Sequence, residues 1–302
     1  MHALRTPDER FDGLPGFPFS PHYTQVPDGD GGALRMHYLD EGPPDGPVVL
    51  LLHGEPSWCF LYRTMIPVLV AQGLRCIAPD LVGFGRSDKP TRPGDHSYAR
   101  HVEWVRSCVL DELGLDDITL FGQDWGGLIG LRLAAEHPKR FARVAIGNTG
   151  LPTGLEPASK AFLAWQQFSQ TTPDFDAGAI VAMAVTSALS AEVTAAYNAP
   201  FPDDSYKAGA RIFPTLVPTD ASDPASAANV SAREALCAWD KPFLTLYSDS
   251  DPITGGGEVW FQRNVPGATG QPHTTITGAG HFLQEDRGPR VAELLARFVA
   301  AR

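Results

Sequence analysis

The chain has 302 residues, of which 43% are hydrophobic and 20% are charged, and its formal net charge is −11. Such an acidic surface argues against nucleic acid and anionic membranes as main partners, because both attract fields of Lys and Arg. The sequence has no run of about 18 apolar residues and no signal-peptide core, so neither a transmembrane helix nor secretion is expected.

The first half of the chain alternates predicted strands with predicted helices. Residues 33–39 alternate apolar and polar side chains, which is typical of a half-buried antiparallel strand. Continuous apolar runs indicate strands that are buried on both faces. These runs cover residues 47–52, 74–80, 118–121 and 141–146, and helices are expected over 97–113 and 128–136.

This alternation stops near residue 152 and resumes with predicted strands over 242–247 and 273–276. The intervening stretch is rich in Ala, Pro, Thr and Asp and fits helices alone. We therefore predict an α/β fold with a mostly parallel, doubly wound sheet. Its core domain comprises residues 1–151 and 229–302, and a helical cap, residues 152–228, covers the carboxyl ends of the strands, where such sheets bind ligands.

The segment Gly122-Gln123-Asp124-Trp125-Gly126 follows a predicted strand and precedes a predicted helix. A nucleophile flanked by glycines in this position is typical of the nucleophile elbow of the α/β-hydrolase fold, where the sharp turn requires small neighbours. The usual nucleophile is Ser, whereas Asp124 takes its place here. The alternative is a Gly-rich turn in which Asp124 only caps the helix.

Two further residues complete a catalytic triad in the chain order typical of this fold, which is nucleophile, acid, histidine. Asp251 follows the strand predicted over 242–247, and His281 follows the strand predicted over 273–276. Asp249 competes with Asp251 for the role of the acid. We favour Asp251, because it lies deeper in the loop, directly before Pro252.

A carboxylate nucleophile needs no base for its attack, but it reacts well only at an sp³ carbon that carries a leaving group. The product is an ester of Asp124. His281 is then free to take a proton from the water that hydrolyses this ester, while Asp251 orients the imidazole. The backbone N–H groups of Glu55 and Trp125 are candidates for the oxyanion hole.

The candidate hydrogen-bond donors of the site indicate which leaving group Asp124 could displace. A halide requires N–H donors, and Trp125 and Trp165 could supply them, because an indole N–H only donates. An epoxide instead requires an acidic proton donor, for which Tyr197 and Tyr206 in the insertion are candidates. Each tryptophan could also be an ordinary packing residue, so both readings remain open on these residues alone.

Several segments resemble the haloalkane dehalogenases, and in particular the subfamily typified by the 1,2-dichloroethane enzyme. They are RTPDERF (5–11), HYLDEG (37–42), HGEPSW (53–58), GFGRSDKP (83–90), QDWGG (123–127) and, in the insertion, APFPDDSY (199–206). The resemblance implies roles as nucleophile for Asp124, base for His281, acid for Asp251, and halide donors for Trp125 and Trp165.

A sister subfamily takes its second halide donor from an Asn at the position of Glu55. An ionised Glu55 cannot donate, which favours Trp165 in that role. Where the 1,2-dichloroethane enzyme has an aromatic residue, this chain has Leu128, so its substrate preference is not transferred. Leu128, Phe162, Phe168 and Phe213 are expected in the substrate pocket.

The expected substrate is a small halogenated hydrocarbon, which water converts to a primary alcohol and halide without a cofactor or metal. The four scattered cysteines are interpreted as buried free thiols of a cytoplasmic protein, and a monomer is expected. The main alternative is an epoxide hydrolase with the same triad. A fluoroacetate dehalogenase is disfavoured, because Trp125 and Leu128 stand near positions where that family has arginines. A non-catalytic hydrolase-like receptor is disfavoured, because the triad is intact.

Overall fold

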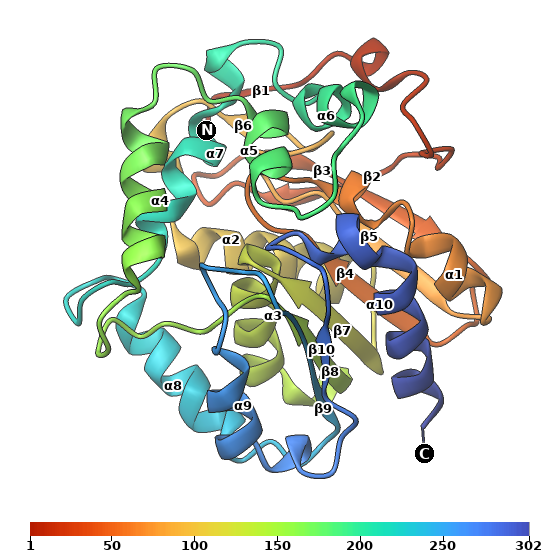
Figure 1. The fold of residues 1–302 in the computed structure, drawn as a ribbon. Coiled ribbons are helices and arrows are strands. Elements are labelled where there is room, and N and C mark those ends of the chain that lie inside the picture. Colours follow the sequence, from red (N-terminus) through yellow and green to blue (C-terminus); the bar gives the residue numbers. More distant parts are fainter. Residues whose placement is uncertain (302) are drawn as a thin grey trace.

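An eight-stranded sheet runs through the protein, whose computed structural model describes residues 1–301 (Figure 1). The strand order across the sheet is β10-β9-β8-β7-β4-β5-β3-β2. The strands are β2 (His22–Pro27), β3 (Ala33–Glu41), β4 (Val48–Leu52), β5 (Arg75–Pro79), β7 (Ile118–Gln123), β8 (Phe141–Gly147), β9 (Phe243–Ser248) and β10 (Thr274–Ile276). Two short strands, β1 (Ala3–Leu4) and β6 (Lys89–Pro90), pair separately.

The six strands from β10 to β5 are parallel to their neighbours, whereas β3 pairs antiparallel with both β5 and β2. This arrangement confirms the predicted mostly parallel sheet and the antiparallel strand near residue 33. From β4 the chain first adds β5 on one side and later β7 on the other. The carboxyl ends of β4 and β7 therefore flank the point where ligands bind in such sheets.

Helices cover both faces of the sheet (Figure 1). On one side α1 packs against α10, and on the other α3 packs between α2 and α8. Their bounds are α1 (Ile66–Ala71), α2 (Tyr98–Arg106), α3 (Trp125–Glu136), α8 (Ser226–Leu236), α9 (Glu258–Asn264) and α10 (Leu283–Ala300). The helix predicted over 97–113 is divided, because α2 passes into a π-helix at Ser107–Glu112. Within residues 1–301, no helix is long and apolar enough to cross a membrane.

The stretch predicted as an insertion contains helices and no strand among its residues, which are all described. Its helices are α4 (Lys160–Thr171), α5 (Ala177–Met183), α6 (Ala191–Asn198) and α7 (Ala208–Ile212). Figure 1 shows α5, α6 and α7 together at one end of the molecule. The expected boundary at residue 228 lies inside α8, which packs against α3 through a hydrogen bond from Arg132 to the Asn229 side chain (3.1 Å).

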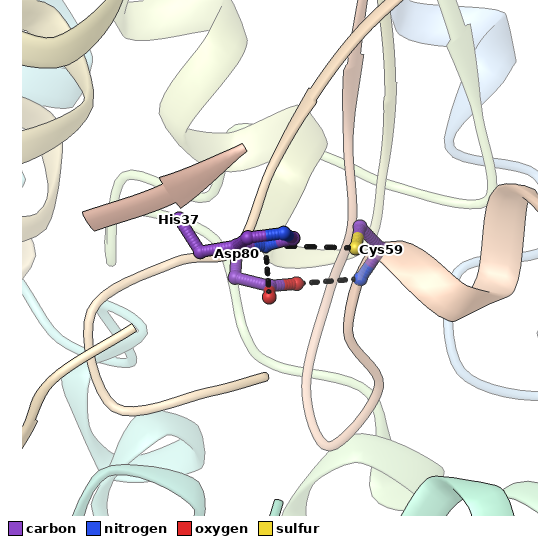
Figure 2. A group of neighbouring side chains, drawn as sticks. All are labelled: His37, Cys59 and Asp80. Atoms are coloured by element: carbon purple, nitrogen blue, oxygen red, sulfur yellow. Dashed lines mark hydrogen bonds and ion pairs between the residues drawn. The ribbon is translucent and has the colours of Figure 1, made fainter. Parts of the chain in front are cut away.

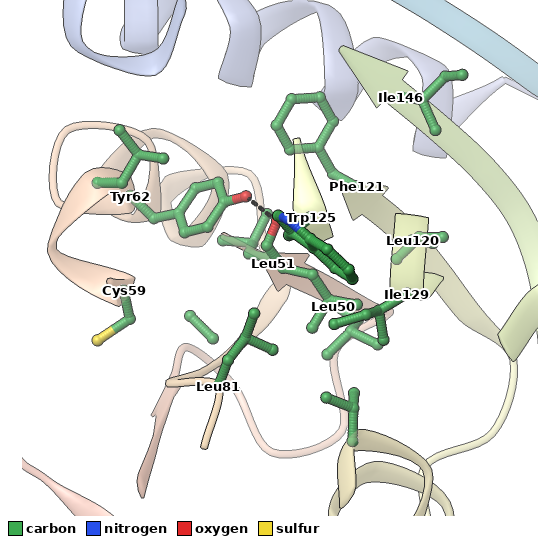
Figure 3. Close-up of a cluster of buried hydrophobic side chains, with 14 of the residues drawn as sticks. Leu50, Leu51, Cys59, Tyr62, Leu81, Leu120, Phe121, Trp125, Ile129 and Ile146 are labelled. Carbon is green, nitrogen blue, oxygen red and sulfur yellow. Dashed lines mark hydrogen bonds between the residues drawn. The ribbon is translucent and has the colours of Figure 1, made fainter. Parts of the chain in front are cut away.

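The apolar strands meet the first turns of α3 in a buried cluster beneath the strand ends (Figure 3). Leu50 and Leu51 of β4 lie near Phe121 of β7 and Trp125 of α3 in this view, and all four side chains are buried. The Tyr62 hydroxyl donates a hydrogen bond to the carbonyl of Leu52 (2.7 Å), which satisfies its one polar group. This packing anchors the base of the elbow on both strands that flank the switch point.

All four cysteines are free, as predicted, but one is not buried. Cys59, Cys76 and Cys108 are buried in the core, whereas Cys237 is exposed. Cys237 caps the C-terminal end of α8, outside the apolar layers. The prediction of a buried thiol was therefore wrong for Cys237.

Candidate active site

The elbow places Asp124 between the end of β7 and the start of α3. Its backbone has φ 50° and ψ −128°, a strained conformation for a residue other than glycine. A Cβ atom on Gly126 would lie 1.8 Å from the carbonyl oxygen of Leu52, and one on Gly122 would lie 2.6 Å from that of Gly126. Both glycines are therefore required for this turn to approach β4.

The carboxylate of Asp124 is held by the loop that follows β4. The backbone N–H of Glu55 donates to Oδ1 of Asp124 at 2.8 Å. Gly54 permits this approach, because a Cβ atom there would lie 2.3 Å from the same oxygen. The N–H of Trp125 belongs to the first turn of α3, where backbone donors lack intrahelical acceptors. The loop after β4 and the first turn of α3 thus each carry one backbone N–H donor, that of Glu55 and that of Trp125.

His281 lies between two carboxylates. Its Nδ1 is 2.9 Å from Oδ2 of Asp251, and its Nε2 is 3.4 Å from Oδ2 of Asp124. Asp249 faces elsewhere and accepts hydrogen bonds from the backbone N–H groups of Gly278 and Ala279. The geometry therefore brings together the three residues favoured from the sequence, with Asp251 rather than Asp249 beside the imidazole.

The two carboxylates control the protonation of His281. Burial alone would lower the pKa of His281, but the Asp251 and Asp124 carboxylates raise it to about 10. Burial likewise opposes ionisation of Asp251, but the charge of His281 and a hydrogen bond from Thr254 lower the pKa of Asp251 to about 2. The two carboxylates therefore favour the charged imidazolium form of His281.

Glu55 contributes a second acidic side chain beside the nucleophile. Its side chain is buried, and its Oε1 has no hydrogen-bond partner among the described residues. Burial, and then the charge of Asp124, raise the pKa of Glu55 well above its usual value. Burial therefore favours the neutral carboxylic acid over the ionised form considered in the sequence analysis.

Two amide side chains that the sequence did not single out hold the His281 loop. Asn148 Nδ2 donates to the carbonyls of Gly280 and His281, both at 2.9 Å, while the backbone carbonyl of Asn148 accepts from the backbone N–H of Asp124 at 3.0 Å. Gln123 Nε2 donates to the His281 carbonyl at 3.2 Å. Asn148 directly follows β8, so its place at the carboxyl end of a parallel strand was the signal that could have found it.

A cavity of about 940 Å³ opens beside Asp124. Most of its lining is apolar, and the predicted pocket residues Leu128, Phe162 and Phe168 belong to it. Phe213 was wrongly expected there. Its ring is fully buried and packs behind Trp125, with ring centres 4.6 Å apart, because α7 turns it towards the core.

Trp125 and Trp165 both line this cavity, Trp125 from α3 and Trp165 from α4. Among residues 1–301, no protein group accepts a hydrogen bond from either indole N–H. The indole of Trp58, in contrast, donates to the carbonyl of Ala196 at 3.1 Å. Within residues 1–301, the indole donors of Trp125 and Trp165, unlike that of Trp58, therefore have no protein partner.

The two tyrosines considered as proton donors are remote from the cavity lining. Tyr197 is fully buried, and its hydroxyl donates to Glu285, which also pairs with Arg63. Tyr206 is partly buried and packs on the core. Neither lines the cavity beside Asp124. The epoxide-hydrolase hypothesis thus has neither of its two candidate proton donors in the cavity.

A second polar cluster, away from the cavity, joins His37, Cys59 and Asp80 (Figure 2). His37 Nδ1 lies 2.7 Å from Asp80 Oδ2 and 4.0 Å from the sulfur of Cys59. Backbone N–H groups of Cys59 and Arg86 each donate to the Asp80 carboxylate at 2.8 Å. Burial raises the pKa of the Cys59 thiol well above its usual value, and Asp80 raises it further. We assign this cluster to holding the loops after β4 and β5.

Comparisons with known proteins show which family this chain resembles. The α/β hydrolase fold family matches residues 47–288. A haloalkane dehalogenase of Psychrobacter cryohalolentis is 60% identical over 99% of this chain and 98% of its own length, and one of Mycolicibacterium paratuberculosis is 54% identical over 97% of each. The haloalkane dehalogenase DpaA of Paraglaciecola agarilytica, described as tetrameric, superposes with a TM-score of 0.91 at 35% identity, covering 100% of this chain and 99% of its own.

Proposed function

Because the chain belongs to the haloalkane dehalogenases, hydrolases that act on carbon–halide bonds, we propose that Asp124, His281 and Asp251 carry out this reaction. The observation that supports these roles is the position of the His281 imidazole, 2.9 Å from Asp251 and 3.4 Å from Asp124. An epoxide hydrolase is not favoured, because Tyr197 and Tyr206 do not line the cavity.

In the first step, Oδ2 of Asp124 attacks the carbon that carries the halogen, while Oδ1 stays bound to the N–H of Glu55. The new carbon–oxygen bond forms as the carbon–halogen bond breaks, and the halide leaves with the bonding electron pair. The free indole N–H groups of Trp125 and Trp165 stabilise the departing halide. Esterification removes the charge of Asp124, so His281 loses one of the two carboxylates that keep it protonated and releases its proton.

In the second step, the neutral His281 takes a proton from a water molecule, whose oxygen attacks the ester carbonyl of Asp124. The oxyanion forms at Oδ1, where the N–H groups of Glu55 and Trp125 stabilise it. The bond from the carbonyl carbon to the alkoxy oxygen then breaks. The leaving oxygen takes a proton from His281 and departs as the alcohol, and the hydroxyl added to Asp124 returns its proton to His281. Asp124 returns as a carboxylate beside a protonated His281, so each turnover yields one alcohol, one halide and one proton.

The test of the triad is halide release from 1-bromobutane and 1,2-dibromoethane by the purified protein and by its Asp124→Ala variant. Release by the native chain alone is expected. Equal release by both would reject Asp124 as the nucleophile.

For the halide donors, Trp165→Phe should weaken the quenching of tryptophan fluorescence by bromide, and unchanged quenching would remove Trp165 from the site.

We also propose that residues 152–228 are a cap domain on a core of residues 1–151 and 229–302. Helix α4 lines the cavity through Phe162, Trp165 and Phe168, opposite the elbow residues of the core.

The cavity volume of about 940 Å³ and the aliphatic Leu128 support substrates of medium chain length. The ratio kcat/KM across 1-bromoalkanes should therefore rise beyond 1-bromoethane. A maximum at 1-bromoethane would contradict this preference.

Two further proposals concern the state of the protein in the cell. All residues assigned above come from one chain, which supports a functional monomer, and light scattering of the purified protein distinguishes it from a tetramer such as that described for DpaA. The four free cysteines support a reducing, cytoplasmic location, which fractionation of the producing cells would test.

A further inference from the structure

The segment between α5 and α6 lies directly on the loop that carries His281. The backbone N–H of His281 donates to the carbonyl of Ala184 at 2.7 Å, and the hydroxyl of Thr186 donates to the carbonyl of Gly278 at 2.7 Å. A Cβ atom on Gly280 would lie 2.4 Å from the carbonyl oxygen of Ala184. We call residues 184–187 the cap strap and residues 278–281 the histidine loop.

One buried carboxylate joins the cap strap to the histidine loop. Asp286, in the first turn of α10, accepts a hydrogen bond from the backbone N–H of Gly280 at 2.8 Å. The same carboxylate accepts from the backbone N–H groups of Thr186 at 3.0 Å and Ser187 at 2.8 Å, and also from the Ser187 hydroxyl. Its side chain is buried, with 8% of the residue exposed.

The link requires an ionised carboxylate, because all of its partners are donors. Burial opposes ionisation, but the hydrogen bonds from Gly280, Ser187 and Thr186 lower the pKa of Asp286. Its position in the first turn of a helix also favours a negative charge. An amide in its place would turn an N–H group towards other N–H groups.

We propose that Asp286 is a positioning residue that ties the cap strap to the histidine loop and thereby sets His281 for hydrolysis of the ester. This inference rests on the proposed function, in which alkylation of Asp124 needs no base and ester hydrolysis does. Loosening the histidine loop should therefore slow the second step and spare the first. The cap strap also lines the cavity through Ala184, Val185 and Thr186, so its release should raise KM as well.

The histidine loop provides a matched control. Asp249 also binds this loop, through the N–H groups of Gly278 at 3.0 Å and Ala279 at 3.3 Å, but it is exposed and forms no hydrogen bond with a residue of the cap strap. Asp249→Asn therefore perturbs the histidine loop alone, whereas Asp286→Asn perturbs both segments.

The experiment measures halide release from 1,2-dibromoethane in a rapid-quench apparatus, together with the intact mass of the protein. For Asp286→Asn we expect a fast release of about one halide per active site, followed by turnover that is roughly 10- to 100-fold slower than in the native chain. The mass of the alkyl ester should accumulate, and KM should rise. Asp249→Asn should accumulate little ester and keep its KM.

Three results would overturn the proposal: equal slowing of both steps by Asp286→Asn, native behaviour of that variant, or equal ester accumulation in Asp249→Asn. Should Asp286→Asn fail to fold, Thr186→Val removes one bond between strap and loop, and absence of ester accumulation in it would equally reject the idea. If the native chain releases no halide, the proposed function fails instead, so the two failures are distinguishable.

Discussion

The nucleophile and the base of the active site are held in different ways. Asp124 is fixed by backbone geometry, because Gly126 fits against β4 with no room for a side chain. His281 lies on an irregular loop after β10. That loop is held by the side chain of Asn148 and by the backbone carbonyl of Ala184 in the cap strap. The nucleophile is therefore held by a backbone turn packed against a neighbouring strand, whereas the position of the base depends on side-chain and loop contacts.

This difference separates the two chemical steps in the molecule. The alkylation step uses Asp124 and the indoles, and its machinery is built mainly into the elbow. The hydrolysis step adds His281, whose position depends on the cap strap and on Asp286. Perturbation of the loops around His281 should thus stop the reaction at the ester, while perturbation of the elbow should stop it at the start.

The largest expected effect comes from removing each reactive group. Asp124→Ala should lower halide release by about 10⁴-fold or more, because no ester can form. His281→Phe should instead release one halide per active site and then stop, since the ester persists. Rapid-quench halide assays and intact mass spectrometry measure both results. Repeated turnover by His281→Phe would contradict the assignment of the base.

A second pair of variants compares the rigidity of the two regions. Gly126→Ala would place Cβ 1.8 Å from the Leu52 carbonyl oxygen inside the sheet, and we expect a loss of about 3 kcal/mol in the free energy of unfolding. Gly280→Ala meets the Ala184 carbonyl at 2.4 Å, but the cap strap can move, so a loss of about 1 kcal/mol is expected.

Urea unfolding followed by circular dichroism measures both losses. Gly94→Ala is the control, because a Cβ atom there meets no atom within 4 Å. Equal destabilisation by Gly126→Ala and Gly280→Ala would remove the proposed contrast between a rigid elbow and an adaptable histidine loop.

The smallest expected effect is the early release of a single proton during turnover. The two carboxylates raise the pKa of His281 to about 10, so we expect a charged His281 at pH 8 in the resting protein. Alkylation neutralises Asp124 and lowers the pKa of His281, so one proton should leave together with the halide and before the alcohol. A stopped-flow measurement with a pH indicator should show this early proton for the native chain and none for His281→Phe. Proton release in phase with the alcohol would reject a charged resting His281.

The raised pKa of His281 also determines how the free energy of unfolding changes with pH. A histidine whose pKa is raised by folding stabilises the protein fully below its ordinary pKa of about 6.5, and this contribution is lost as the pH rises through about 10. The free energy of unfolding should therefore fall across this range, and the fall should be smaller in the His281→Phe variant.

The elbow was predictable from sequence, because its nucleophile and its two glycines form one short motif. Gly122, Asp124 and Gly126 stand within five positions, and strand order then indicated Asp251 and His281 at the same edge of the sheet. The predicted fold class is confirmed, and the structure brings Asp124, Asp251 and His281 together, while their catalytic roles stay a prediction.

The remaining features depend on contacts that a single sequence does not display. Asp286 touches Thr186 from 100 positions away, so no local pattern connects them. Phe213 has the composition of a pocket residue, and only the packing of α7 shows that it supports Trp125 from behind. The protonation of Glu55 depends on burial, which its short motif does not specify.

The distribution of thiols has a practical consequence. Of the four cysteines, all within residues 1–301, Cys237 alone is exposed, and burial raises the pKa of Cys76 and Cys108 to about 12. A maleimide dye should therefore attach at a single native position, so the enzyme can be tethered to a surface in one orientation without any substitution. The same exposure allows two chains to crosslink through Cys237 in air, and sizing experiments on this protein should contain a reductant.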